Sequence, residues 1–288
     1  MDQNELKYWV GLSGFRGLGI KRLKLLRQYF GSIKKIYEAN STGWIKLGIK
    51  PEMAKNWQKR DLDKEMEVLA KSLIKVITIE DKRYPKLLKE IDSPPFVLFV
   101  KGQIEVLNQP SLAVVGTRQP TTYGCQAVQK LVQDLVKNKL VIISGLARGI
   151  DGLVHRNCLV WGGKTVAVLG HGLERVYPPE NRPLSEEIVA KGGALVTEYP
   201  LNFPISKTNF PQRDRIMAGL SLGTLVIEGG EKSGTKITAN FAADYGREVF
   251  CVPGPIGSPQ SEGPAQLIQQ GAKLVTKVED ILEELNLI

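Results

Sequence analysis

The sequence predicts an α/β fold with a mostly parallel β-sheet and helices on both of its faces. Short apolar runs recur through residues 111–288, and helix-length segments separate them. This alternation is typical of βαβ units, which build parallel sheets. The first 72 residues instead carry apolar side chains at helix-like spacings, which indicates a separate helical part.

Residues 111–288 show the alternation and are predicted to form a doubly wound core domain. Strands are expected where the chain is continuously apolar, and helices are expected in the longer segments between these runs. The predicted strands are 112–116, 140–144, 165–169, 194–197, 223–227 and 248–252, and the predicted helices include 122–138, 182–191, 208–220 and 236–246.

Residues 73–110 are predicted to be a connector with short strands that pack on the core. Val76–Ile79 and Phe96–Val100 have the composition of strands, and Pro85 and Pro94-Pro95 interrupt anything longer.

Residues 1–72 are predicted to form a small all-helical domain. Within it, Gly17-Leu18-Gly19-Ile20-Lys21 precedes a basic amphipathic run. This pattern resembles the hairpin of a SAM/helix-hairpin-helix-like module, in which a tight glycine turn aims backbone N–H groups at a DNA phosphate. A plain turn between two helices is the alternative.

The positive charge of the chain is concentrated near its beginning. The net charge is +9, and residues 1–75 hold 16 Lys/Arg against 8 Asp/Glu. One interpretation is a polyanion-facing surface that binds through counterion release. The other is a solvated lysine-rich surface, and composition does not separate the two.

Composition favours a cytoplasmic protein without a metal or cofactor. No apolar run approaches twenty residues, and the chain does not start with a signal peptide, so no membrane association is expected. Three distant cysteines and two histidines make a structural zinc site or a disulfide framework unexpected.

The predicted carboxyl ends of the strands carry glycine, hydroxyl and basic residues. Because ligands of open α/β sheets bind at that edge, we expect a phosphate-binding site there. Glycine lets an anion approach the backbone, and arginine supplies a forked, permanently charged donor. These loops are Gly116–Arg118, Ser144–Asp151, Gly170–Leu173 followed by Tyr177–Arg182, Glu198–Pro200 followed by Asn209–Arg215, and Glu228–Lys236.

Catalytic signatures are absent from these loops. Neither a P-loop nor a clean dinucleotide-binding G-x-G-x-x-G follows the first strand of the core. We interpret His155 and His171 as packed, hydrogen-bonded side chains rather than catalysts. Phe210, three residues before Arg213, has the character of a side chain that stacks on an unpaired base, although it could equally cap the core.

Several long motifs, in fixed order over residues 75–276, carry a family resemblance. They are V-V-G-T-R, S-G-L-A-R-G-I-D-x-x-x-H, A-V-L-G-x-G-L-x-x-x-Y-P-x-x-N, E-Y-P, F-P-x-R-x-R-I-x-A-G-L-S, S-G-T-x-I-T-A-x-x-A, G-R-E-V-F-C-V-P-G and L-I-x-x-G-A-K-L-V. The chain resembles the DprA/Smf family of DNA-processing proteins of bacterial natural transformation. The resemblance implies an extended Rossmann-like fold, single-stranded DNA binding, a homodimer, help in loading RecA recombinase while single-strand-binding protein is displaced, and no catalytic turnover.

The resemblance also implies which residues bind nucleic acid. Backbone N–H groups and cations would hold successive phosphates, and Phe210 would meet a base. The implied residues are Gly116, Thr117, Arg118, Ser144, Gly145, Arg148, Phe210, Arg213, Ser233, Gly234, Thr235 and Lys236.

The chain departs from the family pattern in three places. Asp214 replaces the usual asparagine, and an acid near phosphates weakens binding unless Arg213 or Arg215 neutralises it. The segment Gly263–Ile268 lacks its usual asparagine. The chain is also expected to lack the C-terminal winged-helix domain of many members.

Two alternatives remain open at this point. Gly229–Thr235 resembles the P-G-G-x-G-T-x-x-E loop of LOG-type nucleotide phosphoribohydrolases, but Thr238 stands where that loop has its general acid/base glutamate. A small-nucleotide sensor without a DNA role is the other alternative.

Overall fold

A single mixed β-sheet forms the centre of the computed structural model, which describes residues 3–15, 17–51, 54 and 60–287. Among these residues the sheet has nine strands in the order β1-β2-β6-β5-β4-β3-β7-β8-β9. The strands β3 to β9 pair in parallel, whereas β1–β2 and β2–β6 are antiparallel. The predicted fold class is therefore confirmed. The strands are β1 Ile74–Thr78, β2 Val97–Gly102, β3 Ser111–Val115, β4 Val141–Ser144, β5 Thr165–Val168, β6 Ala194–Thr197, β7 Gly223–Val226, β8 Glu248–Cys251 and β9 Lys273–Leu274.

Helices cover both faces of the parallel part of the sheet. The central strands β3, β4 and β5 are buried along their whole length, because a parallel sheet with two covered faces exposes neither set of side chains. One face packs against α8 Thr122–Lys137, α9 Ile150–Val160, α10 Arg182–Ala190 and α14 Glu279–Glu284. The other packs against α7 Lys86–Lys89, α11 Asn209–Leu220, α12 Thr235–Asp244 and α13 Glu262–Gln269.

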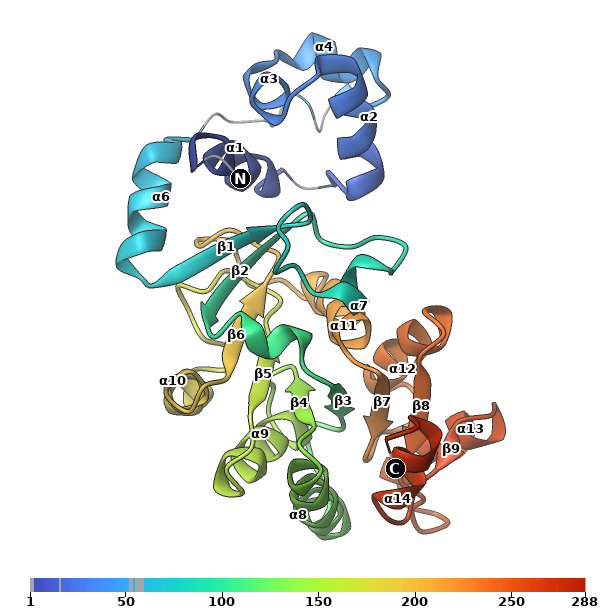
Figure 1. Ribbon diagram of the computed structural model, residues 1–288. Helices are drawn as coiled ribbons and strands as arrows, with labels where there is room; N and C mark the ends of the chain where they lie inside the picture. Colours follow the sequence, from blue (N-terminus) through green and yellow to red (C-terminus); the bar gives the residue numbers. More distant parts are fainter. Residues whose placement is uncertain (1–2, 16, 52–53, 55–59, 288) are drawn as a thin grey trace.

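The N-terminal helices, coloured blue to cyan in Figure 1, lie on the side of β1 and β2 away from the other strands. Their buried apolar side chains form one continuous core with the sheet, and the rings of Trp9 and Phe96 are 6.2 Å apart across that contact. Burial of this shared surface holds the helices against the rest of the molecule. The helices are α1 Gln3–Ser13, α2 Ile20–Phe30, α3 Ile33–Glu38, α4 Ser41–Lys46 and α6 Leu62–Lys71.

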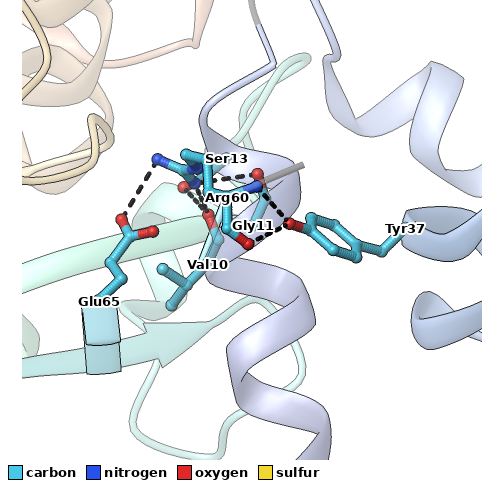
Figure 2. A network of polar contacts seen from close by, with 6 residues as sticks. All are labelled: Val10, Gly11, Ser13, Tyr37, Arg60 and Glu65. Atoms are coloured by element: carbon cyan, nitrogen blue, oxygen red, sulfur yellow. Dashed lines mark hydrogen bonds and ion pairs between the residues drawn. The ribbon is translucent and has the colours of Figure 1, made fainter. Parts of the chain in front are cut away.

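Arg60 ties the C-terminal end of α1 to the segment before α6 (Figure 2). Its guanidinium donates to the carbonyl oxygens of Val10 and Gly11, at 2.7 and 3.0 Å, and lies 3.2 Å from a carboxylate oxygen of Glu65. The Tyr37 hydroxyl accepts a hydrogen bond from the Arg60 backbone N–H at 3.0 Å. These contacts satisfy carbonyl groups that the end of a helix leaves without partners.

Residues 73–110 contribute β1 and β2 to the same sheet as the core strands. The division of the chain at residues 72 and 110 stays a prediction. Near the C-terminus, Ile281 and Leu282 are buried in the core, so these two side chains serve intramolecular packing. No helix in the described part of the chain is long and apolar enough to cross a membrane.

Candidate nucleic-acid interface

An open groove of about 740 Å³ lies at the carboxyl edge of the sheet, where β3 meets β7. From β3 the chain winds to β4, β5 and β6 on one side, and then returns to β7, β8 and β9 on the other. Such a reversal of strand order leaves a crevice between diverging loops. It brings together loops that are more than a hundred residues apart in sequence. The predicted residues that line the groove are Gly116, Thr117, Arg118, Phe210, Arg213, Ser233, Gly234 and Thr235.

The loop after β3 is held in place by Glu228, which follows β7. The Thr117 N–H donates to the Glu228 carbonyl oxygen at 2.8 Å, and the Glu228 carboxylate accepts from the N–H and the hydroxyl of Thr121. A Cβ at Gly116 would lie 2.4 Å from Ile150 Cγ1, so the close approach of α9 requires glycine there. This bracing fixes the backbone from which the exposed side chain of Arg118 projects.

Three side chains form a cation–aromatic cluster at the groove. The Arg118 guanidinium lies 5.9 Å from the centroid of the half-buried Phe210 ring, within the range of a cation–π interaction. The Tyr177 ring, 40% exposed, lies 6.4 Å from that of Phe210. This cluster gives a base an aromatic surface and gives a phosphate a nearby cation.

Helix α11 presents one face to the groove. Phe210, Arg213, Asp214 and Met217 all line it. Their spacing of three and four residues places them on a single side of the helix. Thr208, Asn209, Gln212 and Arg215, on the other side, line a cleft toward the N-terminal helices instead.

Arg213 is buried beneath the groove rather than free to meet a ligand. Only 5% of the residue is exposed, and its guanidinium donates to the Val168 carbonyl oxygen at 3.1 Å. Gly145 leaves the room it needs, since a Cβ there would lie 1.4 Å from Arg213 Nη1. Ser144 is fully buried and donates to the Val114 carbonyl oxygen at 2.7 Å. We therefore expect Ser144 and Gly145 to support Arg213 and not to touch a phosphate.

Two further predicted residues lie outside the groove lining. Arg148 is exposed and forms an ion pair with Glu180. Lys236 donates to the Gln266 side-chain oxygen at 2.7 Å. Each engages a neighbouring polar side chain instead of the groove.

The groove lining also includes Tyr177, Lys207 and Lys232, which are not among the implied binding residues, although Tyr177 and Lys232 belong to loops that the sequence places at this edge. Both lysines are exposed and form no ion pair with a described residue. Lys232 stands in the glycine-rich loop after β7, so its place in that loop was an available signal. Tyr177 lies in the segment 177–182, which the sequence places after the third core strand, whereas Lys207 lies in an irregular segment that no strand end marks.

Charged side chains that are largely buried form part of the groove floor. The Asp214 Oδ1 atom is 3.0 Å from Arg213 Nε, and Arg215 pairs instead with Glu198. Burial raises the pKa of Asp214 to about 6, against the opposing effect of Arg213. Burial also raises the pKa of Asp151. Ion pairing with Arg213 thus only partly offsets the cost of burying these acids.

Both histidines are buried and hydrogen-bonded, as interpreted from the sequence. His155 Nδ1 is 2.7 Å from Thr165 Oγ1, which itself donates to the Ile142 carbonyl oxygen, so the imidazole donates. Burial lowers the pKa of His155 to about 3. His171 Nδ1 donates to the Gly172 carbonyl oxygen at 2.9 Å. No group of three His, Cys, Asp or Glu residues in the described ranges is arranged to hold a metal ion.

Comparison with known proteins places this site in a family context. Residues 75–286 match the family model of DNA recombination-mediator protein A. The chain is 46% identical over 213 residues to DNA processing protein DprA of Bacillus subtilis, an alignment that covers 74% of this chain and 71% of that protein.

Two solved structures are similar to the whole chain or to most of it. The X-ray structure of DNA processing protein A from Streptococcus pneumoniae has a TM-score of 0.81 and 36% identity, and the match covers 98% of each chain. DNA processing protein A from Helicobacter pylori, whose structure concerns its single-stranded DNA binding mode, has a TM-score of 0.66 and 29% identity, with 74% of this chain and 96% of that chain covered. The chain belongs to the DNA recombination-mediator protein A family, as the motifs along its sequence predict.

Proposed function

We propose that this recombination mediator binds single-stranded DNA along the groove, through its phosphates and its exposed bases, and breaks no bond. The observation that carries the proposal is the Arg118–Phe210 cluster, beside two lysines that have no ion-pair partner among the described residues. Cations and an aromatic surface side by side are what unpaired nucleotides require, since every base has a π-face. The single-stranded DNA binding of the H. pylori relative supports the same ligand.

We further propose the partners and setting that the family resemblance implies. The bound strand would be passed to RecA recombinase while single-strand-binding protein is displaced, and the protein would act as a cytoplasmic homodimer. The support for these points is membership of the family, and the groove geometry adds nothing to them.

The site is proposed to be non-catalytic. A phosphoribohydrolase needs a carboxylate to handle a proton at the position of Thr238, whose hydroxyl does not do so near neutral pH. Incubation with AMP-type nucleotides should release no free base. Release of free base would favour the hydrolase.

The direct test compares binding of fluorescent oligo-dT and a matched duplex at about 50 and 200 mM salt. Wild type should prefer the single strand, with affinity that falls as salt rises. Arg118→Ala should weaken binding of every sequence alike and flatten the slope of log K against log salt by about 0.7–1.

Arg182→Ala is the matched control, because that arginine is 75% exposed on α10 and outside the groove. It should leave the slope unchanged. Unaltered oligo-dT binding by Arg118→Ala would remove the loop after β3 from the interface, and equal affinity for duplex would contradict single-strand recognition.

A further inference from the structure

Asp214 is a hydrogen-bond acceptor in a groove otherwise rich in donors. It stands one helical turn after Phe210 on the same face of α11, and 11% of its side chain is exposed. Apart from the contact of Oδ1 with Arg213, it accepts no hydrogen bond from the described residues. Asp151, the other carboxylate among the described lining residues, already faces the Ala147 N–H at 3.4 Å.

Phe210 and Asp214 lie in successive turns of α11, and both line the groove. A base stacked on the Phe210 ring can therefore turn its polar edge toward the next turn of α11, where Asp214 stands. An ionised carboxylate only accepts hydrogen bonds. The side chain therefore distinguishes bases by the donors that their edges present.

Guanine fits such an acceptor best. Its Watson–Crick edge has two adjacent donors, the N1–H and the N2 amino group, which match the two oxygens of a carboxylate. Thymine has one N–H between two carbonyl oxygens, and these oxygens repel the carboxylate. Adenine and cytosine offer one amino group each beside a ring acceptor. Unstacked bases are read on these edges in single-stranded nucleic acids.

We propose that Asp214 selects guanine at the nucleotide that stacks on Phe210. The proposal rests on the proposed function, because it assigns a base preference to one position of the single strand in the same groove. Elsewhere along the strand, contacts remain with phosphates and ring faces, and binding there is tolerant of sequence.

The charged surroundings of Asp214 allow this role above about pH 6. Burial raises its pKa to about 6; Arg213 on α11 and Arg118 after β3 act to lower it, and Asp151 on α9 acts to raise it. Near pH 8 the side chain is thus ionised and accepts two hydrogen bonds. Near pH 5 it is protonated, and one oxygen becomes a donor.

The test uses fluorescent thymidine hexamers in which one internal residue is replaced by deoxyguanosine, deoxyinosine or deoxyadenosine. A single guanine cannot form a quadruplex within one strand, and short strands limit alternative registers. At about pH 8, wild type should bind the guanine hexamer about 5- to 100-fold more tightly than the all-thymine hexamer. Deoxyinosine, which lacks the N2 amino group, should lose most of this gain, and the gain should shrink near pH 5.

Asp214→Asn should abolish the guanine preference and bind the thymine hexamer more tightly than wild type does, because a negative charge beside the phosphates is gone. Asp244→Asn makes the same chemical change at the exposed C-terminal end of α12 and should keep the preference. A structural role for Asp214 alone would instead weaken all hexamers equally.

Equal binding of the guanine and thymine hexamers by wild type would overturn the guanine proposal while single-strand binding stands. So would a preference that survives in Asp214→Asn. If no hexamer and no longer oligo-dT binds, the proposed function itself fails, and the guanine proposal fails with it.

Discussion

The groove and the N-terminal helices place their basic residues differently. In the N-terminal helices, Lys7 lies 2.8 Å from Asp63, and Arg27 forms an ion pair with Glu80. Lys34 lies 3.9 Å from Glu38. Some basic side chains of this region therefore pair with carboxylates of the same chain, whereas others, such as Lys21 and Lys24, form no ion pair with a described residue.

The groove has fewer cations, but they are differently placed. Arg118, Lys207 and Lys232 are exposed, line one hollow and have no carboxylate partner among the described residues. On the proposed function, convergence of unpaired cations beside an aromatic ring, rather than the net charge of a segment, indicates where a polyanion binds.

Removal of the Phe210 ring should have the largest effect on DNA binding. In Phe210→Ala the stacking surface is lost together with its cation–π contact to Arg118. We expect the binding free energy of oligo-dT to weaken by about 1–3 kcal/mol, with little change in the salt slope, since stacking releases no counterions. Fluorescence anisotropy at two salt concentrations measures both quantities.

Phe241→Ala serves as the control for that variant. Phe241 is also half-buried, and it stacks on Tyr245 at a centroid distance of 5.9 Å on α12. It should leave oligo-dT affinity unchanged. Equal losses of oligo-dT affinity in the two variants would mean that Phe210 only packs the core. The groove would then differ from the rest of the surface by its charges alone.

The fold could be predicted from the sequence because its signals are local. Continuous apolar runs such as Leu112–Val115 and Val141–Ile143 are what a strand buried on both faces requires. The order of the strands is not local, and nothing in Val97–Val100 indicates that β2 pairs antiparallel with β6.

The candidate site could be predicted only in part. The loops that follow strands were identified, since strand ends in a parallel sheet share one edge. The direction of each side chain was not available, so the buried Arg213 and the exposed Arg118 had the same weight in the sequence. Lys207 reaches the groove from an irregular segment, whose path depends on tertiary packing.

A second prediction concerns how much the buried acids at the groove lower the stability of the folded protein. Asp151, Asp214 and Arg213 leave one uncompensated negative charge in a buried cluster when both acids are ionised. The pKa of Asp214 is raised from 3.8 to about 6 in the folded protein, so its contribution to stability falls as pH rises through that window and stays low above it.

Asp214→Asn should therefore be more stable than wild type at about pH 8, by of the order of 1 kcal/mol or about 2–4 °C in Tm, and the gain should vanish near pH 4. Thermal unfolding followed by circular dichroism across this range measures it. A loss of stability at pH 8 would show that the contact with Arg213 outweighs the cost of burial.

The smallest effect is expected from the lysines of the N-terminal helices. Lys21 and Lys24 on α2 have no ion-pair partner among the described residues, so they are the fairest test of this region. They line a hollow together with Arg27, Lys89, Glu80 and Asp92, and the two carboxylates oppose an incoming phosphate. Lys21→Gln/Lys24→Gln should flatten the salt slope of oligo-dT binding by less than about 0.7, which is less than one full phosphate contact on a single strand.

Lys164→Gln/Lys191→Gln removes the same charge before the amino ends of β5 and β6, away from the groove, and sets the baseline. If the α2 double variant flattens the salt slope beyond that baseline by as much as Arg118→Ala does, the bound strand extends from the groove to the N-terminal helices. The two regions would then form one interface, and the local pairing of charges in the free protein would not predict which cations meet the DNA.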